Sequence, residues 1–410
     1  MAPWTQHLRW IDLQHARMVD LVTTWAEINS CSHHLAGLDR CAKVISRAFA
    51  ALGGEMRWID LPPREVVDCS GRLIRQGLGR AIHITKRATA PRTALLAIHY
   101  DTVYGAEHPF QHCARIDDHT LRGPGVADAK GGLAVMLVAL EALERSDLGE
   151  HLGWEVLITP DEEVGSPGST PLFTEAAGRN QIGMVFEPAL PDGSLVGARK
   201  GSGNFAAVVT GRAAHAGRDP EKGRNAIHAL AQFIVELKQI ATRVPGATVN
   251  VGMVEGGGPV NVVPDLAIAR FNLRINSSDQ QKQVEEQLRR IGEAINSADG
   301  IHLQVYGSIT APPKPLDGPT VRLFEHVAAC GSELGLSLEW RPGGGVCDGN
   351  RLAAAGLPTV DTLGPRGGNL HSAEEYLLLD SLTERAKLSA LLLFKHAGGE
   401  LDAPLREPRP

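Results

Sequence analysis

Histidine and acidic side chains recur where short apolar runs of the sequence end. These runs cover residues 94–98, 155–159 and 184–186. The histidine and acids that follow them are His99, Asp101, Asp161, Glu162, Glu163 and Glu187. Imidazole nitrogens and carboxylate oxygens bind divalent metals, and carboxylates also act as general acids and bases. The first expectation is therefore metal-assisted or acid–base chemistry.

The pair His99 and Asp101 has the spacing that places two side chains on the same side of a strand. A metal-bound histidine needs an acceptor at its second ring nitrogen to fix the tautomer, and Asp101 is placed to supply it. Taken alone, the pair also fits a structural histidine at the end of a strand.

Two glycine-rich segments contribute further candidate residues. Residues 122–132 contain Asp128 and lead into an apolar helix, and residues 367–372 contain His371. Asp128 could simply cap that helix. A phosphate-binding loop is disfavoured, because neither the Walker spacing nor the dinucleotide fingerprint is present. The three acids 161–163 could likewise be solvated surface residues.

The elements around these residues alternate between strand and helix. Strands are expected at residues 94–99, 154–159 and 184–186, and helices at 132–143 and 171–177, after two helices within 12–52. This alternation predicts an α/β unit with a mainly parallel sheet, whose ligands gather beyond the carboxyl ends of the strands. Two histidines and three carboxylates would suit two zinc ions, leaving Glu162 as a base.

The sequence changes character after Gly197. Strands are expected at residues 203–211, 248–254, 266–275 and 301–306, and helices at 225–240 and 280–296, which is the ferredoxin-like β-α-β-β-α-β order. A proline-rich stretch at 311–315 marks a boundary. We expect a discontinuous catalytic domain, 1–198 and 311–410, with a smaller α+β domain, 199–310, inserted into it.

Composition excludes several classes of protein. The chain has 41 basic and 47 acidic side chains, a formal charge of −6, and no basic run, so a nucleic-acid partner is not expected. No segment approaches the roughly 18 to 20 apolar residues that span a membrane. The first twenty residues lack the apolar core of a secretory signal, and we expect a cytoplasmic protein.

Five motifs in order resemble one enzyme family. The motifs are His99-x-Asp101, Gly123-Pro124-Gly125 with Asp128-x-Lys130-Gly131-Gly132, Asp161-Glu162-Glu163-x-Gly165, Glu187, and His371-Ser372. Together they resemble the zinc-dependent family of glutamate carboxypeptidase, acetylornithine deacetylase and succinyl-diaminopimelate desuccinylase. The resemblance extends over nearly the whole chain and implies a zinc-peptidase-like catalytic domain.

The resemblance implies a role for each matching residue. Asp128 would bridge two zinc ions, Glu162 would be the general base, and Asp101 would be a catalytic residue beside the centre. The Asp128–Ala129 peptide bond would be cis. The terminal zinc ligands would be His99, Glu163, Glu187 and His371. Histidine and carboxylate ligands also accept cobalt or manganese, so the metal itself stays open.

The same resemblance extends to the inserted domain and the substrate. That domain would serve as a dimerisation or lid domain of a homodimer, and His215 would reach the partner subunit's active site to polarise the scissile carbonyl. Asn261 and Arg274 would approach the substrate. Arg341 would bind its carboxylate, as expected for the glutamate carboxypeptidase branch. An exposed surface role is the alternative for both His215 and Arg341.

The expected activity is hydrolysis of an amide bond in a small peptide or acyl amino acid, releasing a carboxylate-bearing amino acid such as glutamate. One alternative is an N-acyl amino acid deacylase with the same metal core. A second is a non-catalytic binding protein on the same fold. Residues 346–350 depart from glutamate carboxypeptidase, which leaves the preferred side chain open.

Overall fold

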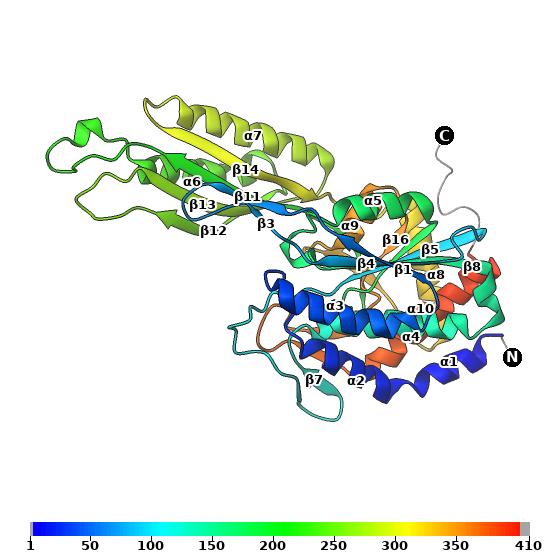
Figure 1. Ribbon diagram of the computed structural model, residues 1–410. Helices are drawn as coiled ribbons and strands as arrows, with labels where there is room; N and C mark the ends of the chain where they lie inside the picture. Colours follow the sequence, from blue (N-terminus) through cyan, green and yellow to red (C-terminus); the bar gives the residue numbers. More distant parts are fainter. Residues whose placement is uncertain (1–2, 402–410) are drawn as a thin grey trace. The chain divides into compact units, whose positions relative to one another are not determined.

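The computed structural model describes residues 3–401 and divides into two compact units (Figure 1). Unit 1 comprises Met1–Pro62, Gly77–Ala198 and Lys314–Pro410, and unit 2 comprises Pro63–Gln76 and Arg199–Pro313. The inserted segment had been expected at 199–310, with everything before it in the catalytic domain. In the structure, residues 63–76 belong to unit 2 instead.

Unit 1 is built on a six-stranded sheet with the order β1-β4-β8-β5-β9-β16. The strands β8, β5, β9 and β16 run parallel, whereas β4 is antiparallel to β8 and to β1. The mainly parallel α/β fold expected from the sequence is confirmed. The strand bounds are β1 Glu55–Asp60, β4 Arg80–Lys86, β5 Arg92–His99, β8 Leu152–Thr159, β9 Ile182–Val185 and β16 Thr359–Val360.

Helices cover both faces of this sheet (Figure 1). Alternate residues of β5 point to opposite faces, so Leu96 and Ile98 join a core with α2, α3, α4 and α10, while Leu95 and Ala97 pack against α5 and α9. Burial on both faces explains why β5 and β8 are almost uninterrupted apolar runs. The helices of unit 1 are α1 Thr5–Asp12, α2 His15–Ala26, α3 Leu35–Ala50, α4 Gly132–Glu144, α5 Thr170–Arg179, α8 Gly318–Glu333, α9 Asp348–Ala354 and α10 Asp380–Gly398.

Two smaller sheets complete unit 1. One has the order β17-β18-β7-β6 and pairs the segment around residue 370 with the segment that precedes residue 123. The other pairs β10 with β15. Their bounds are β6 Ala114–Arg115, β7 Thr120–Arg122, β17 Gly367–Gly368, β18 Tyr376–Leu378, β10 Leu195–Arg199 and β15 Trp340–Gly343.

Unit 2 is a four-stranded antiparallel sheet with the order β12-β13-β11-β14. Its strands are β11 Gly201–Thr210, β12 Thr248–Gly256, β13 Leu266–Ile275 and β14 His302–Ala311, with helices α6 Ala226–Arg243 and α7 Ser278–Asn296. The predicted ferredoxin-like order of elements is therefore confirmed. The hairpin of β2, Arg64–Val67, and β3, Leu73–Gln76, adds Val67 to a small cluster with Val208 and Ile268 of this sheet.

Among the helices of residues 3–401, none has both the length and the apolar composition needed to cross a membrane.

Candidate active site

Three parallel strands deliver candidate residues to one edge of the unit 1 sheet. His99 is the last residue of β5 and pairs in register with Thr159, the last residue of β8. Glu162 and Glu163 follow β8 in a short turn of helix, and Glu187 lies two residues beyond β9. Since β5 lies between β8 and β9, these side chains converge as the apolar runs predicted.

Asp128 lies at the centre of this group, in the tight turn Val126–Gly131 that leads into α4. Its Oδ1 lies 2.9 Å from Nε2 of His99, and its Oδ2 lies 3.4 Å from Nε2 of His371. Glu187 Oε2 is 3.8 Å from the His99 nitrogen, and Glu163 Oε2 is 3.2 Å from the His371 nitrogen. The two oxygens of Asp128 therefore face two separate pairs, each formed by one histidine and one glutamate.

The residues of the site differ in exposure. His99, Asp128 and Glu187 are buried, whereas the side chain of His371 is 55% exposed. The Asp128–Ala129 peptide bond is cis, as expected. Residues 371–372 lie between β17 and β18, and β18 pairs with β7, which holds this loop in the same unit as the Asp128 turn.

Asp101 fixes the orientation of His99. Nδ1 of His99 lies 3.1 Å from the Asp101 carbonyl oxygen and 3.2 Å from its Oδ1. Both atoms are acceptors, so Nδ1 carries a proton and donates it. Nε2 faces the carboxylate oxygens of Asp128 and Glu187. Positive charge therefore belongs between this nitrogen and these oxygens, supplied either by a proton on Nε2 or by a metal ion.

The Asp101 carboxylate also shapes the turn that holds the adjacent acids. It accepts the backbone N–H groups of Glu162 and Glu163, each at 3.2 Å, and the hydroxyl of Ser32 at 2.7 Å. Ser32 was not singled out from the sequence, because a serine in the N-terminal loop carries no local signal of this contact.

The electrostatics of the site reflect crowded carboxylates. Burial, with the nearby charge of Asp128, raises the pKa of Glu163 to about 7, although a hydrogen bond from His371 opposes the shift. Burial also raises the pKa of Glu162 well above its ordinary value. Hydrogen bonds to Asp128 and Glu163 raise the pKa of His371 to about 11. The site therefore attracts positive charge.

For His99 and Asp128, the hydrogen-bonded partners shift the pKa in the direction opposite to burial, and the partners prevail. Burial favours neutral His99, but the carboxylates of Glu187, Asp101 and Asp128 raise its pKa well above the usual range. Burial opposes the charge on Asp128, yet hydrogen bonds from His371 and His99 hold its pKa far below the usual value. Each shift arises from the close pairing of imidazole with carboxylate.

The donor set fits a divalent metal. Ligand atoms of His99, Asp128 and Glu163 all lie within 4.8 Å of one another. Within residues 3–401, no lysine or arginine forms an ion pair with Asp128, Glu162 or Glu163. Nitrogen and oxygen donors of this kind suit zinc, and they also accept cobalt or manganese.

The sequence profile of peptidase family M20/M25/M40 matches residues 95–395, a span that contains every residue of this centre. The chain belongs to this family. It is a metal-dependent peptidase or amidohydrolase, and the family resemblance seen in the sequence is confirmed.

Known relatives of this M20 peptidase differ in substrate. Carboxypeptidase G2 of a Pseudomonas species is 29% identical to it over 321 residues, which cover 75% of each chain. Succinyl-diaminopimelate desuccinylase of Hahella chejuensis is 26% identical over 379 residues, 88% of this chain and 91% of the relative. The structure of aminopeptidase PepT from Bacillus cereus matches with a TM-score of 0.70 and 25% identity, covering 93% of this chain and 99% of that one.

The remaining predicted residues of the M20 peptidase belong to other elements. Arg341 is on β15, where its guanidinium forms an exposed ion pair with Asp192 at 2.8 Å. His215, Asn261 and Arg274 belong to unit 2. There, residue 215 forms an antiparallel bridge with residue 262, which places the His215 loop beside the Asn261 loop.

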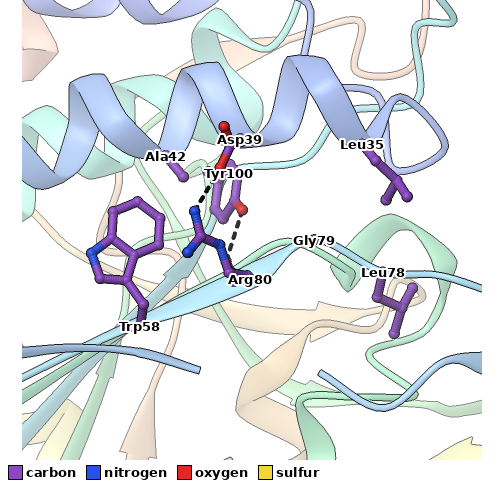
Figure 2. A pocket seen from close by; sticks show the side chains of 8 residues that line it. All are labelled: Leu35, Asp39, Ala42, Trp58, Leu78, Gly79, Arg80 and Tyr100. Atoms are coloured by element: carbon purple, nitrogen blue, oxygen red, sulfur yellow. Dashed lines mark hydrogen bonds and ion pairs between the residues drawn. The ribbon is translucent and has the colours of Figure 1, made fainter. Parts of the chain in front are cut away.

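A pocket of about 170 Å³ lies among α3, β1 and the start of β4 (Figure 2). Arg80 pairs with Asp39 at 2.6 Å, and the Tyr100 hydroxyl donates to the Arg80 carbonyl oxygen at 2.8 Å. Dashed lines mark both interactions in Figure 2. The Arg80 guanidinium also lies 4.4 Å from the centre of the Trp58 ring. The polar groups that line the pocket are therefore partnered with one another. These contacts hold Tyr100, the residue between His99 and Asp101.

Proposed function

We propose that this M20 peptidase holds two zinc ions and hydrolyses an amide bond to release a carboxylate-bearing amino acid such as glutamate. One observation carries the proposal: each oxygen of Asp128 faces its own histidine–glutamate pair. His99 and Glu187 would hold one metal, His371 and Glu163 the other, and Asp128 would bridge them. Cobalt or manganese could replace zinc with the same ligands.

Glu162 is the proposed general base. It follows β8 directly beside Glu163, and the charged groups around it include His99 and Glu187. Zinc ions, when bound, supply Lewis acidity that activates water and polarises a carbonyl oxygen. Glu162 would take a proton from the attacking water and then give it to the departing amine, so one carboxylate serves both proton transfers.

His215 is the proposed donor to the scissile carbonyl oxygen. Its Nδ1 accepts the backbone N–H groups of Gly217, at 3.1 Å, and Arg218, at 3.2 Å. Because Nδ1 is an acceptor, the N–H of the ring is on Nε2. A ring held in this tautomer can donate to an oxygen that gains negative charge. In the proposed homodimer, the partner subunit's His215 completes each active site.

The substrate carboxylate is assigned to arginine. Arg341 is the candidate, because a planar guanidinium binds a carboxylate through two parallel hydrogen bonds. Its ion pair with Asp192 is exposed and would exchange readily for a substrate carboxylate. Asn261 and Arg274 are proposed to contact the rest of the substrate.

A second candidate function is deacylation of N-acyl amino acids. The similarity to succinyl-diaminopimelate desuccinylase extends over 88% of the chain and favours it. The 29% identity to carboxypeptidase G2 favours the carboxypeptidase activity. A non-catalytic binding protein on this fold is a remote third alternative.

A substrate panel on one purified sample distinguishes these candidates. Zinc-loaded protein is assayed with N-acyl-glutamates, folate-like glutamate conjugates, and N-acetyl and N-succinyl amino acids, before and after chelation. Glutamate release that stops on chelation and returns with zinc supports the proposal. Turnover confined to N-acetyl or N-succinyl substrates would transfer the assignment to the deacylase, and binding without turnover would favour the binding protein.

A further inference from the structure

Glu375 lies directly behind the Asp128 turn, although neither the motifs nor the proposed ligand set includes it. Its side chain is buried, with 1% of the residue exposed. Its Oε1 accepts the backbone N–H groups of Ala127, at 3.0 Å, and Asp128, at 3.1 Å, and its Oε2 accepts that of Gly125, at 3.1 Å. One carboxylate therefore binds three amides of the turn that presents Asp128.

Tyr104 connects the same carboxylate to two further segments. Its hydroxyl lies 2.7 Å from Oε2 of Glu375 and 2.9 Å from the carbonyl oxygen of Ser372, the residue after His371. Tyr104 itself follows Asp101 by three residues. The segments that carry Asp101, Asp128 and His371 thus meet at Glu375 and Tyr104.

The contact uses both carboxyl oxygens of Glu375 as acceptors. Backbone N–H groups donate to them, two to Oε1 and one to Oε2. The Tyr104 hydroxyl has a single proton, so it donates either to Oε2 or to the Ser372 carbonyl oxygen, and it lies within hydrogen-bond distance of both. A glutamine has one acceptor oxygen, so it cannot accept at both positions.

The loop that carries His371 also needs support. Asn369 and His371 have φ values of 54° and 61°, in the left-handed region that residues with a β-carbon seldom adopt. Such a conformation persists when neighbouring contacts impose it. The backbone N–H of Gly123 donates to the carbonyl oxygen of Glu375 at 3.2 Å. The backbone N–H of Glu375 donates to the carbonyl oxygen of Ser372 at 3.1 Å, so the backbone of Glu375 also supports this loop.

We infer that Glu375, with Tyr104, is a positioning residue that sets metal affinity by holding the Asp128 turn and the His371 loop in register with each other. The inference rests on the proposed metal centre. Residues that orient metal ligands in this way change metal affinity by about 10- to 100-fold when they are replaced. Glu375 contacts neither metal nor substrate in this assignment and acts through the Asp128 backbone.

The test compares Glu375→Gln and Tyr104→Phe with the parent protein and with Glu374→Gln. Glu374 is the matched control, since it is the adjacent glutamate, its side chain is 69% exposed, and its partner is Arg122 at 3.5 Å. Zinc affinity is measured by competition with a chromophoric chelator. The cobalt-loaded proteins are compared by their visible absorption spectra, and the metal-free proteins by thermal unfolding.

Glu375→Gln is expected to weaken binding of at least one zinc ion by about 10- to 100-fold and to alter the cobalt spectrum. Tyr104→Phe removes one hydrogen bond and is expected to weaken binding about fivefold. Glu374→Gln should match the parent. If Glu375→Gln does not fold, the inference is tested on Tyr104→Phe instead, and parental zinc affinity with a parental cobalt spectrum in that variant would overturn it.

Parental zinc affinity and cobalt spectrum in a folded Glu375→Gln protein would overturn the inference. A lower unfolding temperature of the metal-free variant, with unchanged affinity, would do the same, because it would show a purely structural role. A parent protein that binds no metal would overturn both this inference and the proposed function. If the parent binds two metals but cleaves no amide, only the proposed activity fails, and the affinities still decide the inference.

Discussion

At the scale of residues, the surroundings of two adjacent glutamates fit the different tasks proposed for them. The backbone N–H groups of Glu162 and Glu163 both donate to Asp101, which fixes the turn that they share. From this turn, Glu163 reaches His371 at 3.2 Å. Glu162 makes no such ion pair among the described residues, and its carboxylate is therefore available as a base.

Exchanging each of these glutamates for glutamine should separate the two tasks. Glu162→Gln is expected to lower kcat by about 10²- to 10⁴-fold, because a positioned acid–base group contributes about this much, while both metals stay bound. Glu163→Gln is expected to lose affinity for one metal. Steady-state kinetics together with metal analysis of the dialysed proteins measure both effects. Full activity in Glu162→Gln with both metals present would exclude it as the base.

The sequence was informative about the side chains that cluster at the strand ends but not about the residues behind them. His99, Glu163 and Glu187 were found because each follows an apolar strand, and the sheet topology brings strand ends together. Glu375 was missed because Glu374 and Glu375 are adjacent acids, and no local pattern indicates which of them turns inward. Ser32 and Tyr104 were missed because their contacts depend on tertiary structure alone.

At the scale of elements, a buried glutamate joins β4, β8 and the end of α5. Glu155 lies 2.8 Å from Nε2 of His83 and accepts hydrogen bonds from Arg179 Nε, at 3.2 Å, and Asn180 Nδ2, at 2.8 Å. Burial favours its neutral form, but these three partners outweigh burial and lower its pKa to about 2. The ionised carboxylate therefore stabilises the folded state.

The sign of the pH dependence follows from this lowered pKa. Glutamate in the unfolded chain titrates near 4.5, so the stabilisation is complete above that pH and is lost as the pH falls toward 2. Glu155→Gln should lower the free energy of unfolding by about 2 kcal/mol at neutral pH and flatten its decline below pH 4.5. Denaturant titrations of the metal-free proteins, from neutral pH down to acid pH, measure the free energy of unfolding. The exposed α5 variant Glu175→Gln is the control, and an equal acid profile for both variants would contradict the account.

The hairpin of β2 and β3 yields a second prediction at this scale. Val67 is 8% exposed and packs on Val208 and Ile268, whereas Ile74 of the paired strand is 44% exposed. Val67→Asp buries an unpaired charge in an apolar cluster and should cost about 3 kcal/mol or more. Ile74→Asp should change stability by about 0.5 kcal/mol or less. Hydrogen exchange of the β11 and β13 amides reports the difference, and similar exchange in both variants would show that the hairpin does not stabilise unit 2.

Elements were predicted best where burial is uniform. The strands β5 and β8 and the β-α-β-β-α-β order of unit 2 followed from apolar runs and helical periodicity. The strands between residues 55 and 86 were not predicted, because β2 and β3 have only four residues each and β1 to β3 are largely exposed, so no buried apolar run marks them. That residues 63–76 join unit 2 could not be predicted, since the sequence shows no link between Val67 and Ile268, which are distant in the chain.

At the scale of the whole molecule, the proposed homodimer depends on the surface of unit 2. The strand β12 lies at the edge of its sheet and carries Met253 and Val254, which are 49% and 58% exposed. An exposed apolar edge strand pairs readily with another chain. We propose that a second copy of the chain covers this edge, and that the same dimer brings the partner subunit's His215 to each active site.

Charged substitutions on this edge should separate the subunits. The double variant Met253→Asp with Val254→Asp is expected to reduce the mass in solution from twice 43.8 kDa to 43.8 kDa, and to lower kcat if His215 acts across the interface. Light scattering coupled to size-exclusion chromatography measures the mass. Leu13→Asp, at an 80% exposed position of unit 1, is the control. An unchanged dimer in the double variant would place the interface elsewhere.

The most direct test of the central claim is anomalous diffraction from crystals of the zinc-loaded protein, collected above the zinc absorption edge. The account predicts two peaks on either side of the Asp128 carboxylate, one beside His99 and Glu187 and the other beside His371 and Glu163. A single peak, or zinc bound away from Asp128, would contradict the two-metal centre on which the proposed chemistry depends.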